Sequence, residues 1–271
     1  MNRGFGHPLY IEPLPDYAPR LEALIATLGG YRPGDGIDWR QRIELWLSNF
    51  AGLRDQRIAL EMLERLRIVS DREVVAGCSA LLEKIRGELP RGTRMLHLAH
   101  ETSGAVLMRV LEKELKVRKF AVLRPDDFAK LGELKKLRDG DTAVVWDRFN
   151  GTGRQLRSVV RRYTGHFEKA EKRVASLRLA YISGHPPKKS LPAGVVLHRW
   201  IEDIPMVSPE EADLCARYAE AAGKTETNQK HETGALISFA DNPPNNVPLV
   251  LRARPSETWF TLLDRKETAM P

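Results

Sequence analysis

The sequence predicts an α/β protein, in which a small helical domain precedes a parallel sheet covered by helices on both faces. Up to residue 92, apolar residues recur at the spacing of amphipathic helices. From residue 93, short apolar runs alternate with amphipathic segments, a pattern typical of parallel strands joined by helices. Residues 90–92 (Pro-Arg-Gly) interrupt the periodicity. We therefore expect an N-terminal helical domain at 1–92 and an α/β domain at 93–271.

The N-terminal domain is predicted from apolar periodicity, which indicates helices at 21–28, 38–50, 54–67 and from residue 70 onward. Asp38 with Gln41 resembles a capping pair, and Ser70 with Glu73 resembles a capping box. A turn at 67–70 between two amphipathic helices is compatible with a DNA-binding helix-turn-helix or winged-helix module. It is also compatible with a small helical bundle, which we favour because this packing is common outside nucleic-acid binders.

The α/β domain is predicted to contain strands at 95–99, 119–123, 142–146, 176–183 and 195–199. Helices are expected at 104–115, 126–137, 154–172 and 208–222. Two later apolar runs, 235–239 and 247–251, are expected to form strands or tight irregular structure. Ligands of parallel sheets bind at the carboxyl ends of the strands, so the loops that follow the strands are the candidate sites.

Composition and charge restrict the class of protein. No run of about 18 apolar residues is present and the N-terminus has no apolar signal core, so we expect a cytoplasmic protein without a membrane partner. Cys78 and Cys215 lie far apart in apolar stretches, which favours buried thiols, and no His/Cys/carboxylate spacing indicates a metal site. The net charge of +7 permits a polyanionic partner or a phosphorylated substrate, although surplus surface Lys and Arg are the simpler explanation.

The strongest candidate site is the loop 147–153, between the strand at 142–146 and the helix at 154–172. Asp147 ends the strand and can accept hydrogen bonds from ribose hydroxyls. The small residues that follow let the backbone approach a phosphate, and the helix N-terminus favours negative charge. An ordinary strand-to-helix turn is the structural alternative, and we favour the binding site.

Two further segments are candidates. His100-Glu101-Thr102-Ser103-Gly104 is a second strand-to-helix junction, whose N–H groups can hold another phosphate. Residues 241–246 (Asp-Asn-Pro-Pro-Asn-Asn), with Trp259 and Phe260 behind them, suit a base-binding wall or a packing element equally well. The basic residues Arg154, Arg157, Arg161 and Arg162 follow the first loop, and a solvated helix face is the simpler explanation for them.

The segment 143–155 (AVVWDRFNGTGRQ) resembles the phosphoribosyl-pyrophosphate (PRPP) loop of phosphoribosyltransferases, most closely in the PRTase-CE branch from bacterial conflict systems. Thr102-Ser103-Gly104 is similar to the pyrophosphate loop of that branch, and ALISFADNPPNNVPLVL with Trp259 and Arg265 is similar to its C-terminal signature. The segment WRQRIELWLSNF resembles its leading helical region, so the resemblance covers most of the chain. It implies a phosphoribosyltransferase-like parallel sheet with flanking helices.

The resemblance also implies roles for residues. Asp147 would be the catalytic carboxylate that holds the ribose hydroxyls, residues 151–153 would cradle the 5′-phosphate, and Ser103 with Gly104 would contact pyrophosphate. The expected substrate-binding residues are Asn150, Gly151, Thr152, Gly153, Thr102, Ser103, Gly104, Asn245 and Asn246. The implied cofactor is Mg²⁺, which bridges pyrophosphate and ribose in such enzymes. The implied chemistry makes or breaks a bond at the anomeric carbon, as pentosyl transfer or as cleavage of a nucleotide's glycosidic bond.

Relatives of this kind are associated with anti-phage systems, including retrons, in which a reverse transcriptase and its RNA–DNA hold an effector in check. The resemblance therefore implies a toxic effector that acts on a phosphorylated nucleotide or PRPP-like ligand, with the retron reverse transcriptase and its RNA–DNA as partners. Arg148 stands where the family pattern has a second acid, and a guanidinium can only donate hydrogen bonds. The alternative is thus a catalytically degenerate module that binds a nucleotide or nucleic acid as a sensor or regulator.

Overall fold

The computed structural model describes residues 6–32, 37–118, 122–123, 138–151, 154–169, 171, 173–187, 190–223, 233–245, 247–254, 256 and 259–263. The chain divides into two compact units, of which the first comprises Met1–Asp71 and Ile204–Pro271 and the second comprises Arg72–Asp203. The N-terminal helices thus share a unit with the C-terminal segment. This division does not coincide with the boundary at 92/93, which stays a prediction about separate folding domains.

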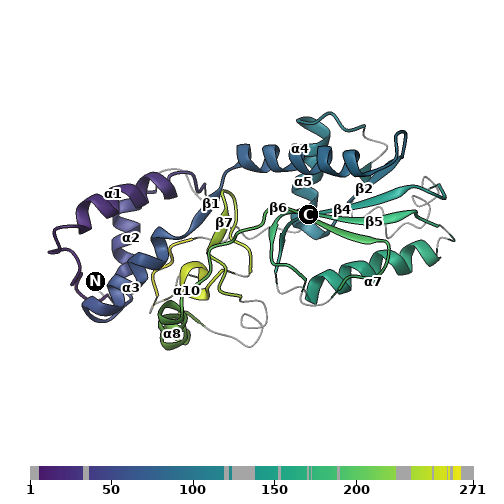
Figure 1. Ribbon diagram of the computed structural model, residues 1–271. Coiled ribbons are helices and arrows are strands. Elements are labelled where there is room, and N and C mark those ends of the chain that lie inside the picture. The colour runs from purple at the N-terminus through teal and green to yellow at the C-terminus, as the bar shows by residue number, and fades with distance from the viewer. Residues whose placement is uncertain are drawn as a thin grey trace. The chain divides into compact units, whose positions relative to one another are not determined.

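The second unit contains a five-stranded sheet, drawn in Figure 1. Its strands are β2 (Met95–Ala99), β3 (Val122–Leu123), β4 (Thr142–Asn150), β5 (Ser176–Gly184) and β6 (Val195–Ile201). They lie in the order β3-β2-β4-β5-β6 and every pair is parallel. The predicted parallel α/β architecture is therefore confirmed. The helix expected at 126–137 lies outside the described residues.

Helices cover both faces of this sheet, because β4 and β5 are apolar on both sides. The inner face of α7 (Arg154–Lys169) packs on one side, where Leu156, Val159 and Phe167 join Val145 and Leu179 in one core. On the other side lies α4 (Asp71–Glu88), with Gly77 directly over the ring of Trp200. Figure 1 shows α4 and α5 (Glu101–Lys113) on one side of the sheet and α7 on the other.

The first unit is mainly helical. Its described residues form α1 (Tyr17–Leu28), α2 (Trp39–Leu47), α3 (Gly52–Glu64), α8 (Pro209–Tyr218) and the single turn α10 (Leu249–Arg252). The backbone N–H of Gln41 donates to the Asp38 carboxylate at 3.1 Å, so the predicted capping pair is confirmed. Trp46 lies in the core and its indole N–H donates to the carbonyl of Val250 at 2.8 Å.

The predicted turn at 67–70 is wrong for most of its length. Residues Arg67–Val69 form strand β1, which pairs in parallel with β7 (Ile237–Phe239). Ile68 and Val69 are β-branched and favour a strand once a partner is present. The helix-turn-helix interpretation depended on that turn, and a strand takes its place. The run 247–251 also differs from a strand, because its second half forms α10.

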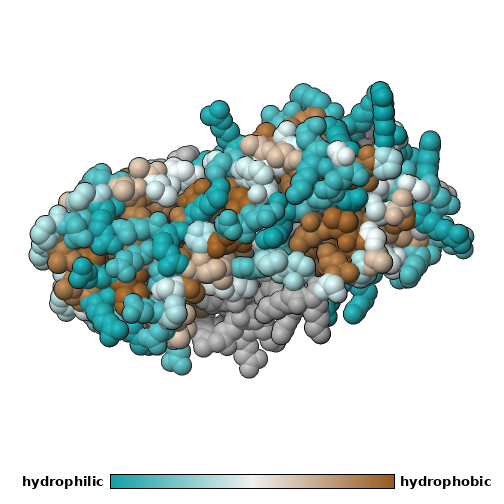
Figure 2. Space-filling view, in the orientation of Figure 1, coloured by the Kyte–Doolittle hydropathy of each residue, from teal (hydrophilic) through white to brown (hydrophobic). Residues whose placement is uncertain are grey.

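The cysteines are both buried and free, which confirms the expectation of thiols. Burial raises the pKa of the Cys78 thiol to about 12 and keeps it protonated. Figure 2 shows hydrophilic residues over much of the visible face, with apolar residues in smaller patches. Within the part of the chain that the structure describes, no helix combines the length and the apolar character needed to cross a bilayer.

Candidate functional site at the carboxyl edge of the sheet

The strand order singles out one position on the sheet. From β2 the chain passes through α5 to β3 at one edge, whereas from β4 it passes through α7 to β5 on the opposite side. The connections therefore diverge between β2 and β4. In parallel α/β sheets this switch point, at the carboxyl ends of the strands, is where ligands bind. Both predicted phosphate loops follow the two strands that flank it.

Two predicted residues meet at this point. The hydroxyl of Ser103, in the first turn of α5, donates a hydrogen bond to Oδ1 of Asp147 on β4. The backbone N–H of Arg148 donates to the same oxygen at 2.7 Å. Asp147 is 7% exposed, so its charge is held by these donors largely away from bulk water. Ser103 and Asp147 were predicted from separate motifs, and the fold brings them into contact.

Asp147 lies inside a strand and not at the start of a loop. β4 continues to Asn150 because β5 extends equally far and pairs with it, with Asp147 opposite Tyr181 and Asn150 opposite Gly184. Side chains alternate along a strand, so Arg148 projects to the face opposite that of Asp147. The expected loop 147–153 is thereby reduced to residues 151–153, of which Thr152 and Gly153 lie outside the described residues.

Gly104 allows α5 to approach the sheet closely. A Cβ at this position would stand 2.5 Å from the carbonyl oxygen of Trp146. The Gly104 N–H donates to the carbonyl of His100 at 2.9 Å within the first helical turn. Gly104 therefore provides the space for this close approach. The N–H groups earlier in the first turn of an α-helix have no acceptor within the helix. The side chain of Thr102 lies outside the described residues.

Asn150 is fully buried and braces the end of β4. Its side-chain amide donates to the main-chain carbonyl of His185 at 2.7 Å, and the main-chain carbonyl of Asn150 accepts from the His185 N–H at 3.0 Å. Gly184 lies so close that a Cβ there would be 2.5 Å from Cβ of Asn150. Asn150 thus fixes the strand ends beside the site. Gly151, which follows it, is buried.

Two buried hydrogen bonds hold the strands that lead to the site. The indole N–H of Trp146 donates to Nδ1 of buried His97 at 2.9 Å, and the Tyr163 hydroxyl of α7 donates to the carbonyl of Ala99 at 2.6 Å. Burial, with Arg86 contributing, lowers the pKa of His97 to about 4, so the ring stays neutral at physiological pH. The sequence does not single out these residues, because a lone His or Tyr among apolar residues carries no signal of its contacts.

The C-terminal candidates belong to the first unit. The buried guanidinium of Arg252 donates to the carbonyls of Val247 and Asn245, each at 2.8 Å, and so holds this loop from inside. Asn245 is exposed and Asn246 lies outside the described residues. Trp259 is buried against Phe50, with 5.7 Å between ring centroids. The packing interpretation therefore holds for Trp259.

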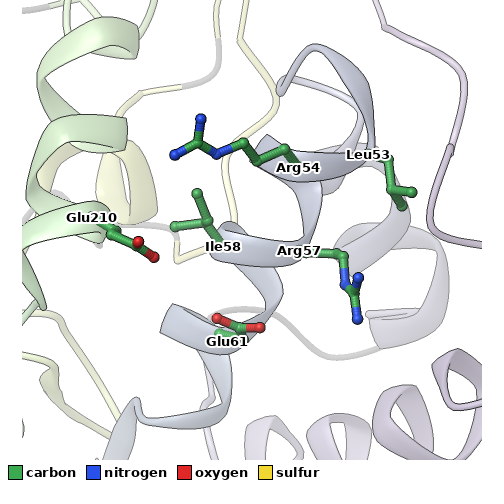
Figure 3. A pocket seen from close by; sticks show the side chains of 6 residues that line it. All are labelled: Leu53, Arg54, Arg57, Ile58, Glu61 and Glu210. Carbon is green, nitrogen blue, oxygen red and sulfur yellow. The ribbon is translucent and has the colours of Figure 1, made fainter.

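A separate surface hollow of about 490 Å³ lies in the first unit between α3 and α8. Its lining comprises Leu53, Arg54, Arg57, Ile58, Glu61 and Glu210, as Figure 3 shows. None of these residues was predicted as a site residue. Among the described residues, no cluster of three or more His, Cys, Asp or Glu side chains is arranged to hold a metal ion.

Comparison with known proteins identifies the family. The family model PRTase-CE matches residues 43–191, more than half of the 271-residue chain, and this stretch includes Ser103, Gly104 and Asp147. No curated protein matches significantly. A solved hypothetical protein from Neisseria gonorrhoeae with bound ppGpp is 16% identical and covers 55% of this chain and 92% of its own, but its TM-score of 0.33 does not establish a shared fold. The chain therefore belongs to the PRTase-CE family and carries a phosphoribosyltransferase-like α/β module.

Proposed function

We propose that the chain is a phosphoribosyltransferase-like effector of a bacterial anti-phage system, acting in the cytoplasm on a nucleotide or PRPP-type substrate. The observation that carries this proposal is the contact between Ser103 and Asp147 at the switch point of the sheet. A carboxylate and a helix N-terminus lie side by side there. The first suits ribose hydroxyls and the second suits phosphate.

The roles follow from the chemistry of each group. Asp147 accepts hydrogen bonds from the ribose hydroxyls, and the Ser103 hydroxyl, which already donates to it, keeps the carboxylate oriented. The first turn of α5 offers N–H groups and the positive end of its dipole to the pyrophosphate. Charge that builds up on departing pyrophosphate is stabilised there as the anomeric bond breaks. The 5′-phosphate is assigned to residues 151–153.

Magnesium fits this set of donors. Mg²⁺ in phosphate sites is commonly held by one or two carboxylates together with substrate phosphates. Asp147 supplies one carboxylate, and a pyrophosphate would supply the remaining anionic oxygens. When bound, the ion would neutralise charge on the pyrophosphate, while Asp147 orients the ribose.

A binding-only module is the second candidate, and Arg148 is the observation that favours it. Arg148 follows the carboxylate directly and stands where the family pattern has a second acid, and a guanidinium can only donate hydrogen bonds. Such a module would bind the nucleotide or PRPP without turnover and report its presence to a partner. It uses the same Ser103 and Asp147 contact.

Turnover separates the two candidates. The assay follows pyrophosphate release from PRPP with Mg²⁺, with and without nucleobase or nucleotide acceptors, for the wild type and for Asp147→Asn. Release that disappears in the variant supports the enzyme. Tight binding of PRPP without release, in the presence of every acceptor tested, supports the sensor.

The defence role is tested in cells. A retron-type system places a reverse transcriptase and a non-coding RNA beside the effector gene, so the genomic neighbours identify the proposed partners. Phage challenge should then show protection by the complete system and its loss with Asp147→Asn. Full protection by that variant would contradict a catalytic effector.

A further inference from the structure

Helix α7 has two chemically distinct faces. Its apolar face, formed by Leu156, Val159, Val160, Tyr163 and Phe167, is buried against the sheet. Its opposite face is exposed and carries four cations, Arg157, Arg161, Arg162 and Lys169, with Glu168 as the acidic side chain among them. This face of α7 therefore carries a net positive charge.

The two arginines nearest the start of the helix, Arg157 and Arg161, form no ion pair with any described residue. Arg157 and Arg161 are separated by one turn and so point in the same direction. Both are exposed, and within the described part of the chain neither has a carboxylate partner. By contrast, the exposed Arg86 of α4 is paired with Glu83 at 2.9 Å.

A neighbouring histidine responds to the charge of this face. The pKa of His166 is lowered by partial burial and then by the nearby cations Lys169 and Arg162. Cations that disfavour a third positive charge favour an anion for the same reason. The face is thus an anion-attracting surface that extends over several turns.

We propose that this cationic face of α7 binds the phosphate backbone of a single-stranded nucleic acid whose end runs toward Asp147. The helix begins at Arg154, shortly after β4 ends at Asn150, so its N-terminal end lies at the edge of the sheet that carries Asp147. A strand that follows the arginines toward that end delivers its terminal nucleotide to the candidate site.

The surface chemistry favours nucleic acid over a membrane. A helix that lies in a bilayer interface needs an exposed apolar face, and the apolar face of α7 is used by the sheet. Among the residues that the structure describes, the exposed large hydrophobic side chains are Tyr10, Leu45, Leu53 and Val196, and none of them lies on α7. The aromatic residues of α7 are buried too, so binding should depend on phosphates, without sequence preference.

A single strand suits the position of Asp147 better than a duplex. The carboxylate is almost buried, and a base-paired nucleotide must leave its duplex before an enzyme can reach it. This step rests on the proposed function and narrows its substrate class, from free nucleotides to a nucleotide at the end of a strand.

The test measures binding of a mixed-sequence single-stranded DNA oligonucleotide to the full chain by fluorescence anisotropy at several salt concentrations. The plot of log affinity against log salt has a slope of about −0.7 per neutralised phosphate on a single strand, so Arg157→Ala with Arg161→Ala should reduce its magnitude by about 1.4. Arg157→Lys with Arg161→Lys should keep the wild-type slope. The matched control is Arg54→Ala with Arg57→Ala, which removes two exposed arginines from α3.

The proposal is overturned by an unchanged slope in the α7 alanine pair, by an equal change in the α3 control, or by tighter binding of the same sequence as a duplex. Binding to phosphatidylserine vesicles in place of the oligonucleotide would also overturn it. Asp147→Asn should leave the salt slope unchanged. If the chain binds the oligonucleotide but shows no enzymatic turnover, only the proposed enzyme is refuted. If it turns over PRPP but does not bind the oligonucleotide, only this inference is refuted.

Discussion

Gly104 lies against the carbonyl of Trp146 so closely that a methyl group on it would stand 2.5 Å from the oxygen. The two residues belong to the elements that carry the site, since Gly104 follows Ser103 on α5 and Trp146 precedes Asp147 on β4. The approach of Ser103 to Asp147 therefore depends on the absence of a side chain at residue 104.

Gly104→Ala should destabilise the protein and loosen the site. Overpacking costs about 1–3 kcal/mol and exceeds the gain in helix propensity of up to about 1 kcal/mol. The control is Gly165→Ala in α7, where a Cβ would meet nothing within 4 Å and where stability should rise by about 0.5–1 kcal/mol. Urea unfolding measures both; a Gly104→Ala protein that gains as much as the control would contradict the close contact.

Asn150→Asp tests the brace at the end of β4. The substitution keeps the shape but removes the amide that donates to His185, and it buries a negative charge. We expect a loss of about 2 kcal/mol or more at neutral pH, with partial recovery as acid protonates the carboxyl. Asn245→Asp, at an exposed position, should change the free energy of unfolding by less than about 0.5 kcal/mol. Equal effects of the two substitutions would contradict the proposed bracing role.

Asp55 should make the first unit sensitive to acid. Hydrogen bonds from Arg217 at 2.5 and 2.9 Å and from the Tyr218 hydroxyl at 2.8 Å lower its pKa below the ordinary value. Because the pKa is lowered in the folded state, ionised Asp55 stabilises the fold at pH values above the unfolded pKa of about 3.9. This stabilisation is lost as the pH falls through the folded pKa. Asp55→Asn should cost about 1.5–3 kcal/mol at pH 7 and flatten the stability profile below about pH 4.

The exposed Asp213 provides the control for that prediction, because it also pairs with Arg217, at 3.0 Å. Asp213→Asn should change stability by less than about 0.5 kcal/mol, as exposed pairs of this spacing contribute little. Thermal unfolding across pH measures both variants. An Asp213→Asn effect as large as that of Asp55→Asn would show that burial of Asp55 is unimportant.

His97 should produce a second, separate pH dependence in the second unit. Its pKa is about 4 in the folded protein and about 6.5 when unfolded, so the unfolded state binds an additional proton between these values. Stability should therefore fall as pH drops from about 6.5 to 4. His97→Asn keeps an acceptor for Trp146 but does not titrate, so its profile should be flatter in this window. The same slope in both proteins would exclude His97 as the cause.

The sequence predicted most of the sheet because buried strands are short, continuous apolar runs. The strand at 95–99 has the predicted limits, whereas β4 runs four residues beyond the predicted end, to Asn150. Those four residues are mixed in polarity, and pairing with β5 keeps them extended. β1 was missed because its partner β7 lies far away in the sequence, and local periodicity carries no signal of such pairing.

The site was predicted in parts. Ser103 and Asp147 each follow from local motifs, but their contact is a consequence of strand order, which the sequence does not show directly. The Pro-Asn-Asn segment was chosen because its composition is unusual. In the structure, the buried guanidinium of Arg252 donates to the main-chain carbonyls of Asn245 and Val247 at the end of this segment.

The central claim is that Ser103 and Asp147 form the floor of a phosphoribosyl site. Calorimetric titration of the full chain with PRPP and Mg²⁺ tests it most directly, with Asp147→Asn as the variant and Asp213→Asn as the exposed, isosteric control. Loss of a hydrogen bond to a charged group costs about 1.5–3 kcal/mol, so Asp147→Asn should weaken binding by about 10- to 100-fold. Unchanged affinity in Asp147→Asn, or an equal loss in the control, would contradict the claim.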